Sequence, residues 1–239
     1  MCGSITKWCL LLLLLPFAAL GQTAQDSSAG KESKAPVVEA ASRQLRLGFD
    51  IGRFLFNSFY KNKTGYELML DDHLRRDLYL VAEGGWGNSD IDYDNLKYRT
   101  DNTFFRLGFD KFMFPRKRPE DWDGAFVGLR YGLGLGNRSE AWYRTDDGLG
   151  GVTTGTTAAS SFTAHWFELT GGMRMELLPH IFAGWNIRGR FLLNQRALGE
   201  LAPAYIAGFG PGDKQAVFDF NFYLSYALRW PKRPAVSRQ

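Results

Sequence analysis

Large apolar side chains alternate with polar or small ones along much of this chain. The clearest example is residues 218–230, FDFNFYLSYALRW, where aromatic and leucine side chains occupy one parity. In an extended strand, such alternation places the two kinds of side chain on opposite faces. These 13 residues exceed the roughly 5–6 of an ordinary globular strand and the about 9–11 that a tilted strand needs to cross a bilayer. The segment therefore predicts a membrane-spanning strand.

The same alternation predicts seven further strands, and the connections between them differ in length by position. Short or proline-marked connections fall at residues 71–77, 112–123 and 178–180, while the other connections are longer, the longest being 135–161. Short turns at one end and long loops at the other are typical of outer-membrane barrels. We therefore expect an all-β fold, an eight-stranded antiparallel transmembrane up-and-down β-barrel with both termini periplasmic. The expected strands are 45–52, 66–70, 78–86, 105–110, 127–134, 167–177, 181–191 and 218–230.

The polar face of these strands indicates which side points inward. Alternation alone does not, because a soluble barrel alternates too. Glycine, arginine, acidic residues and asparagine dominate this face, and lysine is almost missing from it, which suits a confined interior where charges must be paired. An eight-stranded barrel is just filled by its side chains, so we expect a filled polar interior without an open pore. The expected ion-pair network comprises Arg46, Arg106, Arg130, Arg174, Arg188, Arg190 and Arg229 with Asp50, Glu67, Glu83, Asp110, Glu168, Glu176 and Asp219.

Tryptophans occur near several predicted strand ends, where membrane barrels carry an aromatic girdle. Trp86, Trp166, Trp185 and Trp230 are the candidates, and all four are expected to face lipid. The partners expected for such a barrel are outer-membrane lipid and the barrel-assembly machinery that inserts it. A soluble barrel remains the alternative to this orientation.

The N-terminus predicts secretion. Lys7 precedes the apolar run 9–15, and the small-residue stretch that ends at Gly21 fits a signal-peptidase site, so we expect a signal peptide at 1–21. Residues 22–44 are polar and should form a flexible periplasmic segment, followed by the barrel at 45–230 and a periplasmic tail at 231–239. Both cysteines, Cys2 and Cys9, lie in the leader, which leaves the mature chain without thiolate ligands or disulfides.

Charge gives little reason to expect a nucleic-acid partner. The 29 basic and 25 acidic residues nearly balance, and the arginines are spread through the strands instead of forming one basic face. No apolar run approaches 18 residues after Gly21, which excludes a transmembrane helix.

Short strand motifs support this fold by resemblance. The sequence RLGFD occurs at residues 46–50 and again at 106–110, and AFVGLRYG occupies 125–132. In these motifs the chain resembles a family of small outer-membrane β-barrels of unknown function from Bacteroidota. The resemblance implies fold and location but no catalytic residue; some small barrels of that phylum resemble accessory subunits of assembly or secretion machines. Many such chains end on the terminal aromatic, so here the assembly signal is expected to be internal, at Leu228 and Trp230.

Candidate reactive motifs are weak. The acidic spacing of Asp90, Asp92 and Asp94 suits a hard cation, but the remaining ligands of a calcium loop are missing, so we expect an exposed acidic loop. His165 is a candidate base for a lipid hydrolase, yet it shares parity with lipid-facing Phe167 while Glu168 faces the lumen. We therefore expect no metal, no cofactor and no enzyme activity.

Cations beside aromatics at the inner rim suggest either headgroup anchoring or a docking surface for a periplasmic partner. The candidate docking residues are Arg116, Lys117, Arg118 and Trp122. The sequence as a whole favours a structural or interaction protein of the outer membrane that works by presenting loops or binding partners. The alternatives are an accessory subunit of an outer-membrane assembly or secretion machine, a narrow channel, and a rim-sited lipid-modifying enzyme.

Overall fold

The computed structural model describes residues 42–59, 62–75, 77–114, 121–199 and 201–231. The predicted signal peptide and the docking residues Arg116, Lys117 and Arg118 lie outside these ranges. The elements are β1 (Ser42–Asp50), α1 (Ile51–Phe59), β2 (Lys63–Arg75), β3 (Leu78–Tyr93), β4 (Leu96–Phe112), β5 (Gly124–Arg138), β6 (Ala141–Asp146), β7 (Val152–Thr157), β8 (Ser160–Leu178), β9 (Ile181–Leu192), a 3-10 helix (Gln195–Leu198) and β10 (Ala216–Pro231).

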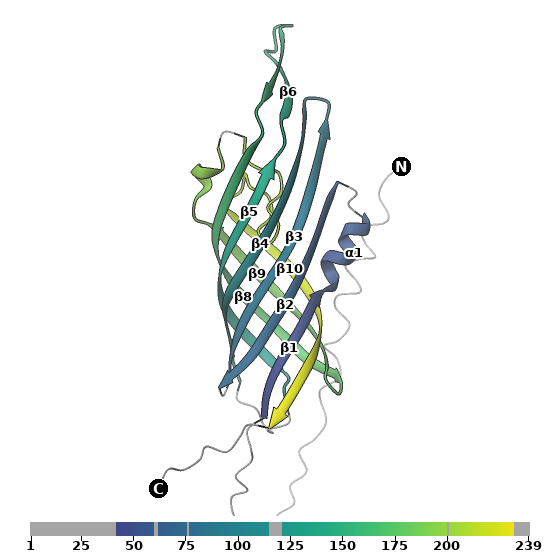
Figure 1. Cartoon of the computed structure of the whole chain (residues 1–239), viewed down its shortest axis with the longest axis vertical. Helices are drawn as coiled ribbons and strands as arrows, with labels where there is room; N and C mark the ends of the chain where they lie inside the picture. The colour runs from purple at the N-terminus through teal and green to yellow at the C-terminus, as the bar shows by residue number, and fades with distance from the viewer. Residues whose placement is uncertain (1–41, 60–61, 76, 115–120, 200, 232–239) are drawn as a thin grey trace, which may run out of the picture. The chain divides into compact units, whose positions relative to one another are not determined.

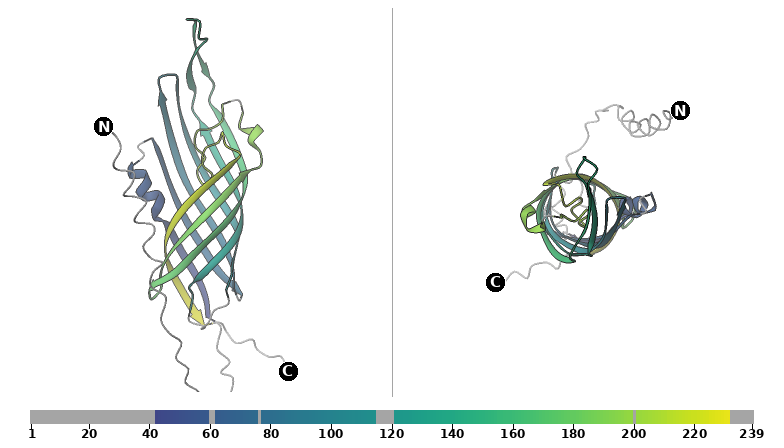
Figure 2. Two further views of the ribbon diagram at one scale, coloured as in Figure 1. Left: turned by 180° about the vertical axis from the view of Figure 1, so that it is seen from behind. Right: turned by 90° about the horizontal axis from the view of Figure 1, so that it is seen from above.

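Eight of the strands form one closed antiparallel barrel. Around the wall they follow the order β1, β2, β3, β4, β5, β8, β9 and β10, and β10 pairs with β1 to close the ring. In Figure 1 this closure is where the purple and yellow strands meet, and the view from above in Figure 2 shows the ring. The predicted eight-stranded antiparallel barrel is confirmed. Among the described residues, no helix is long and apolar enough to cross a membrane.

Several strands are longer than their apolar alternation predicted. β3 and β4 continue to a tight turn at Asp94 and Asn95, so the expected second long loop is a hairpin and Asp90 and Asp92 are strand residues. The expected loop at 135–161 is also largely strand, because β5 and β8 extend into it and β6 pairs with β7. Beyond the apolar belt both faces of a strand can be polar, so the alternation that identifies a strand disappears although the pairing continues.

Helix α1 replaces the predicted end of the first strand. The Asp50 side chain accepts a hydrogen bond from the backbone N–H of Arg53 at 3.1 Å, as an N-cap does. β1 therefore ends at Asp50, whereas β2 and β10, its two neighbours, continue further towards the upper end of the barrel in Figure 1. Helix α1 packs against both of them, and Figure 2 shows it on the outside of the ring.

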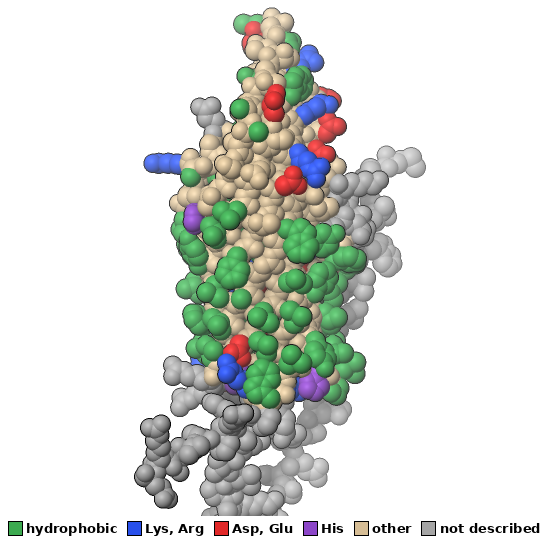
Figure 3. Space-filling view, viewed as in Figure 1, with side chains coloured by type: hydrophobic (Ala, Val, Ile, Leu, Met, Phe, Trp, Pro, Cys, Tyr) green, Lys and Arg blue, Asp and Glu red, His purple; other side chains and the backbone are tan. Residues whose placement is uncertain are grey.

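The two faces of the wall differ in the way the sequence predicted. Large apolar side chains of β4, β5, β8, β9 and β10 point outward and are exposed, among them Leu129 at 59%. Arg106, Arg188 and Glu168 point inward and are fully buried. Figure 3 shows apolar side chains covering the barrel wall on the viewed side, with charges gathered above and below them.

Candidate functional site

The centre of the barrel holds a network of fully buried charges. The Arg106 Nε lies 2.8 Å from Glu83, and its Nη1 donates to Glu168 at 3.0 Å. Arg188 donates to Glu83 at 3.0 Å and to Glu67 at 2.9 Å. Glu67 also accepts from Arg106 and from the hydroxyl of Tyr223. Strand parity places these side chains inside, and each carboxylate meets two or more arginines, as buried charges require.

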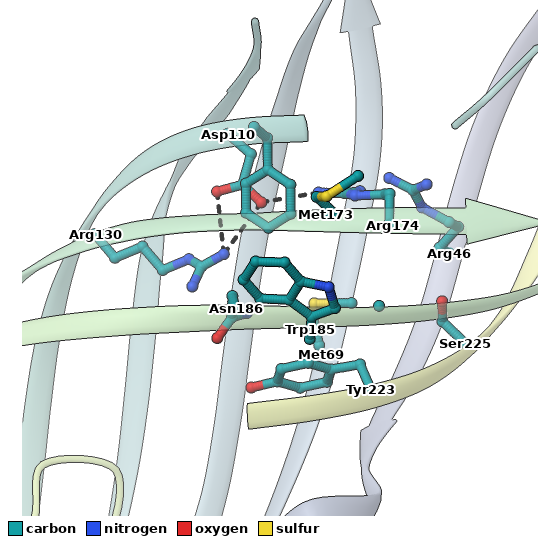
Figure 4. A pocket seen from close by; sticks show the side chains of 12 residues that line it. Arg46, Met69, Asp110, Arg130, Met173, Arg174, Trp185, Asn186, Tyr223 and Ser225 are labelled. Atoms are coloured by element: carbon teal, nitrogen blue, oxygen red, sulfur yellow. Dashed lines mark hydrogen bonds and ion pairs between the residues drawn. The ribbon is translucent and has the colours of Figure 1, made fainter. Parts of the chain in front are cut away.

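A second layer lies below this centre, towards the end where β10 terminates. Arg174 joins two aspartates there, donating to Asp71 at 3.1 Å and to Asp110 at 2.9 Å. Arg46 donates to the other oxygen of Asp71 at 2.8 Å, and Arg130 donates to Asp110 at 3.0 Å. Figure 4 shows Asp110 between Arg130 and Arg174. The cavity at this level measures about 20 Å³, room for about one water molecule.

Aromatic side chains close the barrel beneath these arginines. The guanidinium of Arg174 lies 4.6 Å from the ring centre of Phe126, and that of Arg46 lies 4.8 Å from Tyr79. Such cation–π contacts add to the ion pairs that hold both arginines. We call the cluster of buried apolar residues at this end the lower plug; it contains Met69, Tyr79, Val81, Phe112, Trp122, Phe126, Phe182, Tyr223 and Ala227.

The opposite end is closed by a loop that folds into the barrel. Arg106 donates to the backbone carbonyl of Gly208 at 3.0 Å, and Arg190 donates to that of Phe209 at 2.9 Å. Gly208 has a φ of +76°, and a Cβ there would lie 2.4 Å from the Phe104 ring, so the turn requires glycine. We call this buried cluster the upper plug; it contains Phe104, Phe162, Ala164, Trp166, Leu192, Leu198, Ile206, Ala207 and Phe209.

Trp166 corrects one prediction. It was expected in the lipid-facing girdle, but its side chain is fully buried and its ring centre lies 5.7 Å from that of Phe209. Trp166 shares the parity of Glu168, so the strand alternation itself identifies it as an inward residue. The indole occupies the space above Gly132, where a Cβ would lie 2.2 Å from the ring. Trp86, Trp185 and Trp230 are on the outer surface, and Leu228 is exposed beside Trp230.

The predicted network residues do not all meet. Arg229 and Glu176 form a separate, partly exposed pair of 2.6 Å. Asp219 lies 2.9 Å from Arg190 and equally close to Arg53. Asp50 contacts none of the predicted arginines: it caps α1, lies 3.4 Å from the Arg53 Nε and accepts from Asn221.

Sequence reasoning missed three members of the network. Asp71 had been assigned to a turn, although it continues the parity of Glu67 and Met69 along β2, and that parity was the available signal. Tyr223 shares the parity of Asp219 and Asn221 along β10, but its phenol was not predicted to join the network. Arg53 had no signal, because its position depends on a helix that the strand alternation did not predict.

The inner-rim docking prediction fails for Trp122. Its side chain is only 2% exposed, and the Arg229 guanidinium lies 5.4 Å from its ring centre. The indole belongs to the lower plug and is not available to a partner. The three cationic docking candidates lie outside the described residues.

The candidate reactive groups are spread apart. The Tyr131 hydroxyl and His165 Nδ1 form a hydrogen bond of 2.7 Å on the outer surface, whereas Glu168 is fully buried on the inner one. A nucleophile–histidine–acid triad with Glu168 is therefore excluded by the wall that separates the two groups. Among the described residues, no group of three or more histidine, cysteine or acidic side chains could hold a metal.

Solved structures of several outer-membrane barrels resemble this chain distantly. The N-terminal β-barrel domain of OprF from Pseudomonas aeruginosa is 10% identical, with a TM-score of 0.36, covering 80% of this chain and 98% of that chain. Ail, the attachment invasion locus protein of Yersinia pestis, is 7% identical, with a TM-score of 0.39 and coverages of 80% and 99%. Likenesses this distant carry no functional argument. No curated protein matches the chain.

A family model describes nearly the whole chain. Residues 1–233 match the family called domain of unknown function (DUF6048). The predicted resemblance to barrels of unknown function agrees with this match, while the Bacteroidota origin remains a prediction. The chain thus belongs to the DUF6048 family.

Proposed function

We propose that this protein is an integral outer-membrane β-barrel that acts as a structural or interaction protein, presenting loops and binding partners without an open pore. One observation carries this proposal: charged side chains are buried inside the barrel while large apolar ones are exposed outside it. In water this arrangement would be unfavourable, because exposed apolar surface and buried charge both raise the free energy of the fold.

The outer belt fits a bilayer. Along β5, Val127, Leu129 and Tyr131 point outward, and along β10 Phe220, Phe222 and Leu224 do the same. Trp86 and Trp230 are exposed near opposite ends of the wall, as amphipathic rings at the two membrane interfaces would be. A closed barrel also pairs its backbone groups between strands, which a lipid environment requires.

The filled lumen argues against the channel alternative. The lower plug, the central ion pairs and the upper plug occupy successive levels of the barrel, and the cavity beside Asp110 is about 20 Å³. A porin-type pore needs a continuous water path, which much wider barrels provide. Within the described ranges, no arrangement of reactive groups favours the enzyme alternative.

The ends of the barrel support one orientation in the membrane. We propose that the lower end is periplasmic, because β1 begins there and β10 ends there, and the short connections of membrane barrels are periplasmic. The β6–β7 hairpin and the upper plug would then lie on the extracellular side. Insertion would depend on the barrel-assembly machinery, with Leu228 and Trp230 as the terminal assembly signal.

A second candidate, an accessory subunit of an outer-membrane assembly or secretion machine, is favoured by one feature of the wall. β1 ends before its neighbours do, which leaves edges of β2 and β10 without a strand between them. An obligate partner could use such edges.

Gentle detergent extraction of the tagged protein from outer membranes, followed by native-size analysis and mass spectrometry, tests the proposal. We expect the protein in the outer-membrane fraction with a protein partner in fixed stoichiometry. A lone barrel that gives discrete conductance steps in a planar bilayer would contradict both the interaction role and the sealed lumen.

A further inference from the structure

Between β2 and β10, the barrel wall contains a strand over only part of its height. β1 pairs with residues 68–72 of β2 and residues 223–231 of β10, and it ends at Asp50. Residues 63–67 of β2 and 216–222 of β10 continue beyond that point, and on their other sides they pair with β3 and β9. We call these two edges the seam. A strand edge at membrane depth is unfavourable unless protein covers it.

Helix α1 covers the seam, and Arg53 anchors the helix there. The guanidinium passes inward to lie 3.2 Å from Glu67 and 2.9 Å from Asp219, and its Nη1 donates to the Tyr205 hydroxyl at 3.2 Å. The next two side chains, Phe54 and Leu55, are exposed on the outside. As a continuation of β1, residue 53 would share the outward parity of Leu47 and Phe49 and put its charge in lipid. The helix avoids that cost by turning Arg53 inward.

The inner partners of Arg53 do not depend on it for hydrogen bonding. Glu67 is also bound by Arg106 and Arg188, and Asp219 by Arg190. Asp50 keeps its hydrogen bond from Asn221. If α1 moved away, these carboxylates would each retain a donor, so the central network would survive the loss of Arg53.

The charge balance of the lumen would not survive the loss of Arg53. With Arg53, the buried network has seven arginines for seven carboxylates; without it, one negative charge is uncompensated. A buried charge without a partner is costly. Whatever replaces α1 at the seam must therefore bring a cation to the level of Glu67 and Asp219.

We propose that the seam is a docking site for an extended segment of an outer-membrane protein partner, and that α1 is its displaceable cover. The segment pairs with residues 216–222 of β10 and directs an Arg or Lys side chain to Glu67 and Asp219 in place of Arg53. Strand addition suits this site: once α1 has moved, the β10 edge supplies backbone donors and acceptors, except the Phe220 N–H, which donates to Asp219 at 2.9 Å. The carboxylates supply specificity. The inference rests on the proposed membrane location and interaction role.

A disulfide tests whether α1 must move. A Cβ on Gly52 would lie 3.9 Å from the Cβ of Phe222, within the about 3.5–4.5 Å of natural disulfides. The double variant Gly52→Cys, Phe222→Cys should lock α1 on β10 when oxidised and free it when reduced. The native cysteines, Cys2 and Cys9, are both in the predicted leader. The shift in gel mobility on heating that folded barrels show checks that each variant is folded.

The readout is a photo-crosslinking amino acid at Phe220 on the seam, with Leu129 on the opposite wall as the control position. In the producing cells we expect Phe220 to crosslink a protein whose captured peptide is an extended segment carrying Arg or Lys. Oxidation of the lock should lower this yield at least tenfold, and reduction should restore it. In the unlocked protein, Arg53→Leu should raise it several-fold and Arg53→Lys should not.

Three results would overturn the inference: only lipid adducts at Phe220, no adduct at all, or a protein adduct whose yield is the same with the lock oxidised and reduced. Any of these in a protein that still inserts and still co-purifies with a stoichiometric partner rejects the seam alone. Failure of insertion or of co-purification in the unsubstituted protein would instead reject the proposed function.

Discussion

The lower and upper plugs seal the same barrel by different means. Apart from Trp122, the lower plug consists of side chains from the strands themselves, such as Tyr79 on β3 and Phe182 on β9. The upper plug depends on Ile206 and Phe209, which belong to the connection between β9 and β10. A plug made of wall residues cannot leave without unfolding the wall, whereas a loop can leave an intact barrel. We therefore expect the lower plug to contribute to global stability and the upper plug to a local equilibrium.

The central network joins the two plugs, so its disruption should have the largest effect. Arg106→Leu removes the donor that Glu67, Glu83, Glu168 and the Gly208 carbonyl share. Loss of one partner from a buried ion pair costs about 3–5 kcal/mol. We expect a fall of that size in the free energy of unfolding, measured by urea titration in lipid vesicles.

Arg99→Leu is the matched control for Arg106→Leu. Arg99 pairs with Asp101 at 3.3 Å on the exposed upper strands, where an ion pair contributes about 0–1 kcal/mol. Equal losses in the two variants would show that the interior network is not the source of the effect.

Truncation of the lower plug should also act globally. Phe182→Ala removes a fully buried ring that lies 5.1 Å from the Arg46 guanidinium, and removal of a buried phenylalanine side chain costs about 3–5 kcal/mol. The urea midpoint should fall with the slope unchanged, because the barrel still unfolds as one unit. An unchanged midpoint would mean that the lower plug does not support the wall.

The wall that encloses both plugs is proposed to face lipid. Leu129→Arg places a charge on the exposed face of β5 and should cost about 2–4 kcal/mol if that position is at mid-membrane. The same substitution at Leu149, which is 94% exposed at the tip of the β6–β7 hairpin, should leave insertion unaffected. Insertion is measured as heat-modified gel mobility in membrane fractions. Normal insertion of both variants would contradict the orientation of the wall.

A substitution in the upper plug should change the local structure of its loop and not the global stability of the barrel. Gly208→Val forces a branched side chain into a positive φ and against Phe104, a strain of about 1–3 kcal/mol. We expect the loop 201–215 to become sensitive to protease added outside the cell, while the urea midpoint changes little. A midpoint shift as large as that of Phe182→Ala would remove the difference between the plugs.

The smallest effect is expected outside the barrel, at the hairpin tip. Backbone N–H groups of Leu149 and Gly151 donate to Asp147, both at 2.8 Å, and lower the pKa of its carboxyl. A lowered pKa means that the carboxylate orders the tip fully above the ordinary value of about 3.9, and that this order is lost as the pH falls through the lowered pKa. The protection of the Leu149 amide, its hydrogen-exchange rate relative to the intrinsic rate at the same pH, should therefore fall in acid, and Asp147→Ala should show little protection at any pH.

Strand parity made most of the interior predictable. Arg106, Arg188 and Glu168 were identified as inward residues from alternation alone, and the same rule applied to Trp166 and Asp71 would have corrected both errors. Parity failed where the chain leaves the strand geometry. Arg53 faces inward because of a helix, and Phe209 does so because a loop folds back on its own barrel. Arg53 meets Asp219 and Tyr205, and Phe209 meets Trp166, all far away in sequence, so no local pattern indicates these contacts.

The central claim is that the belt around the sealed lumen faces lipid. A spin label at Leu129→Cys in the vesicle-reconstituted protein, compared with one at Leu149→Cys, tests it most directly through collision with oxygen and with a water-soluble nickel chelate. Our account predicts that the label at residue 129 is reached by oxygen and not by the chelate, while the label at residue 149 is reached by the chelate. Equal chelate access at both positions would contradict it and identify a barrel that stands in water.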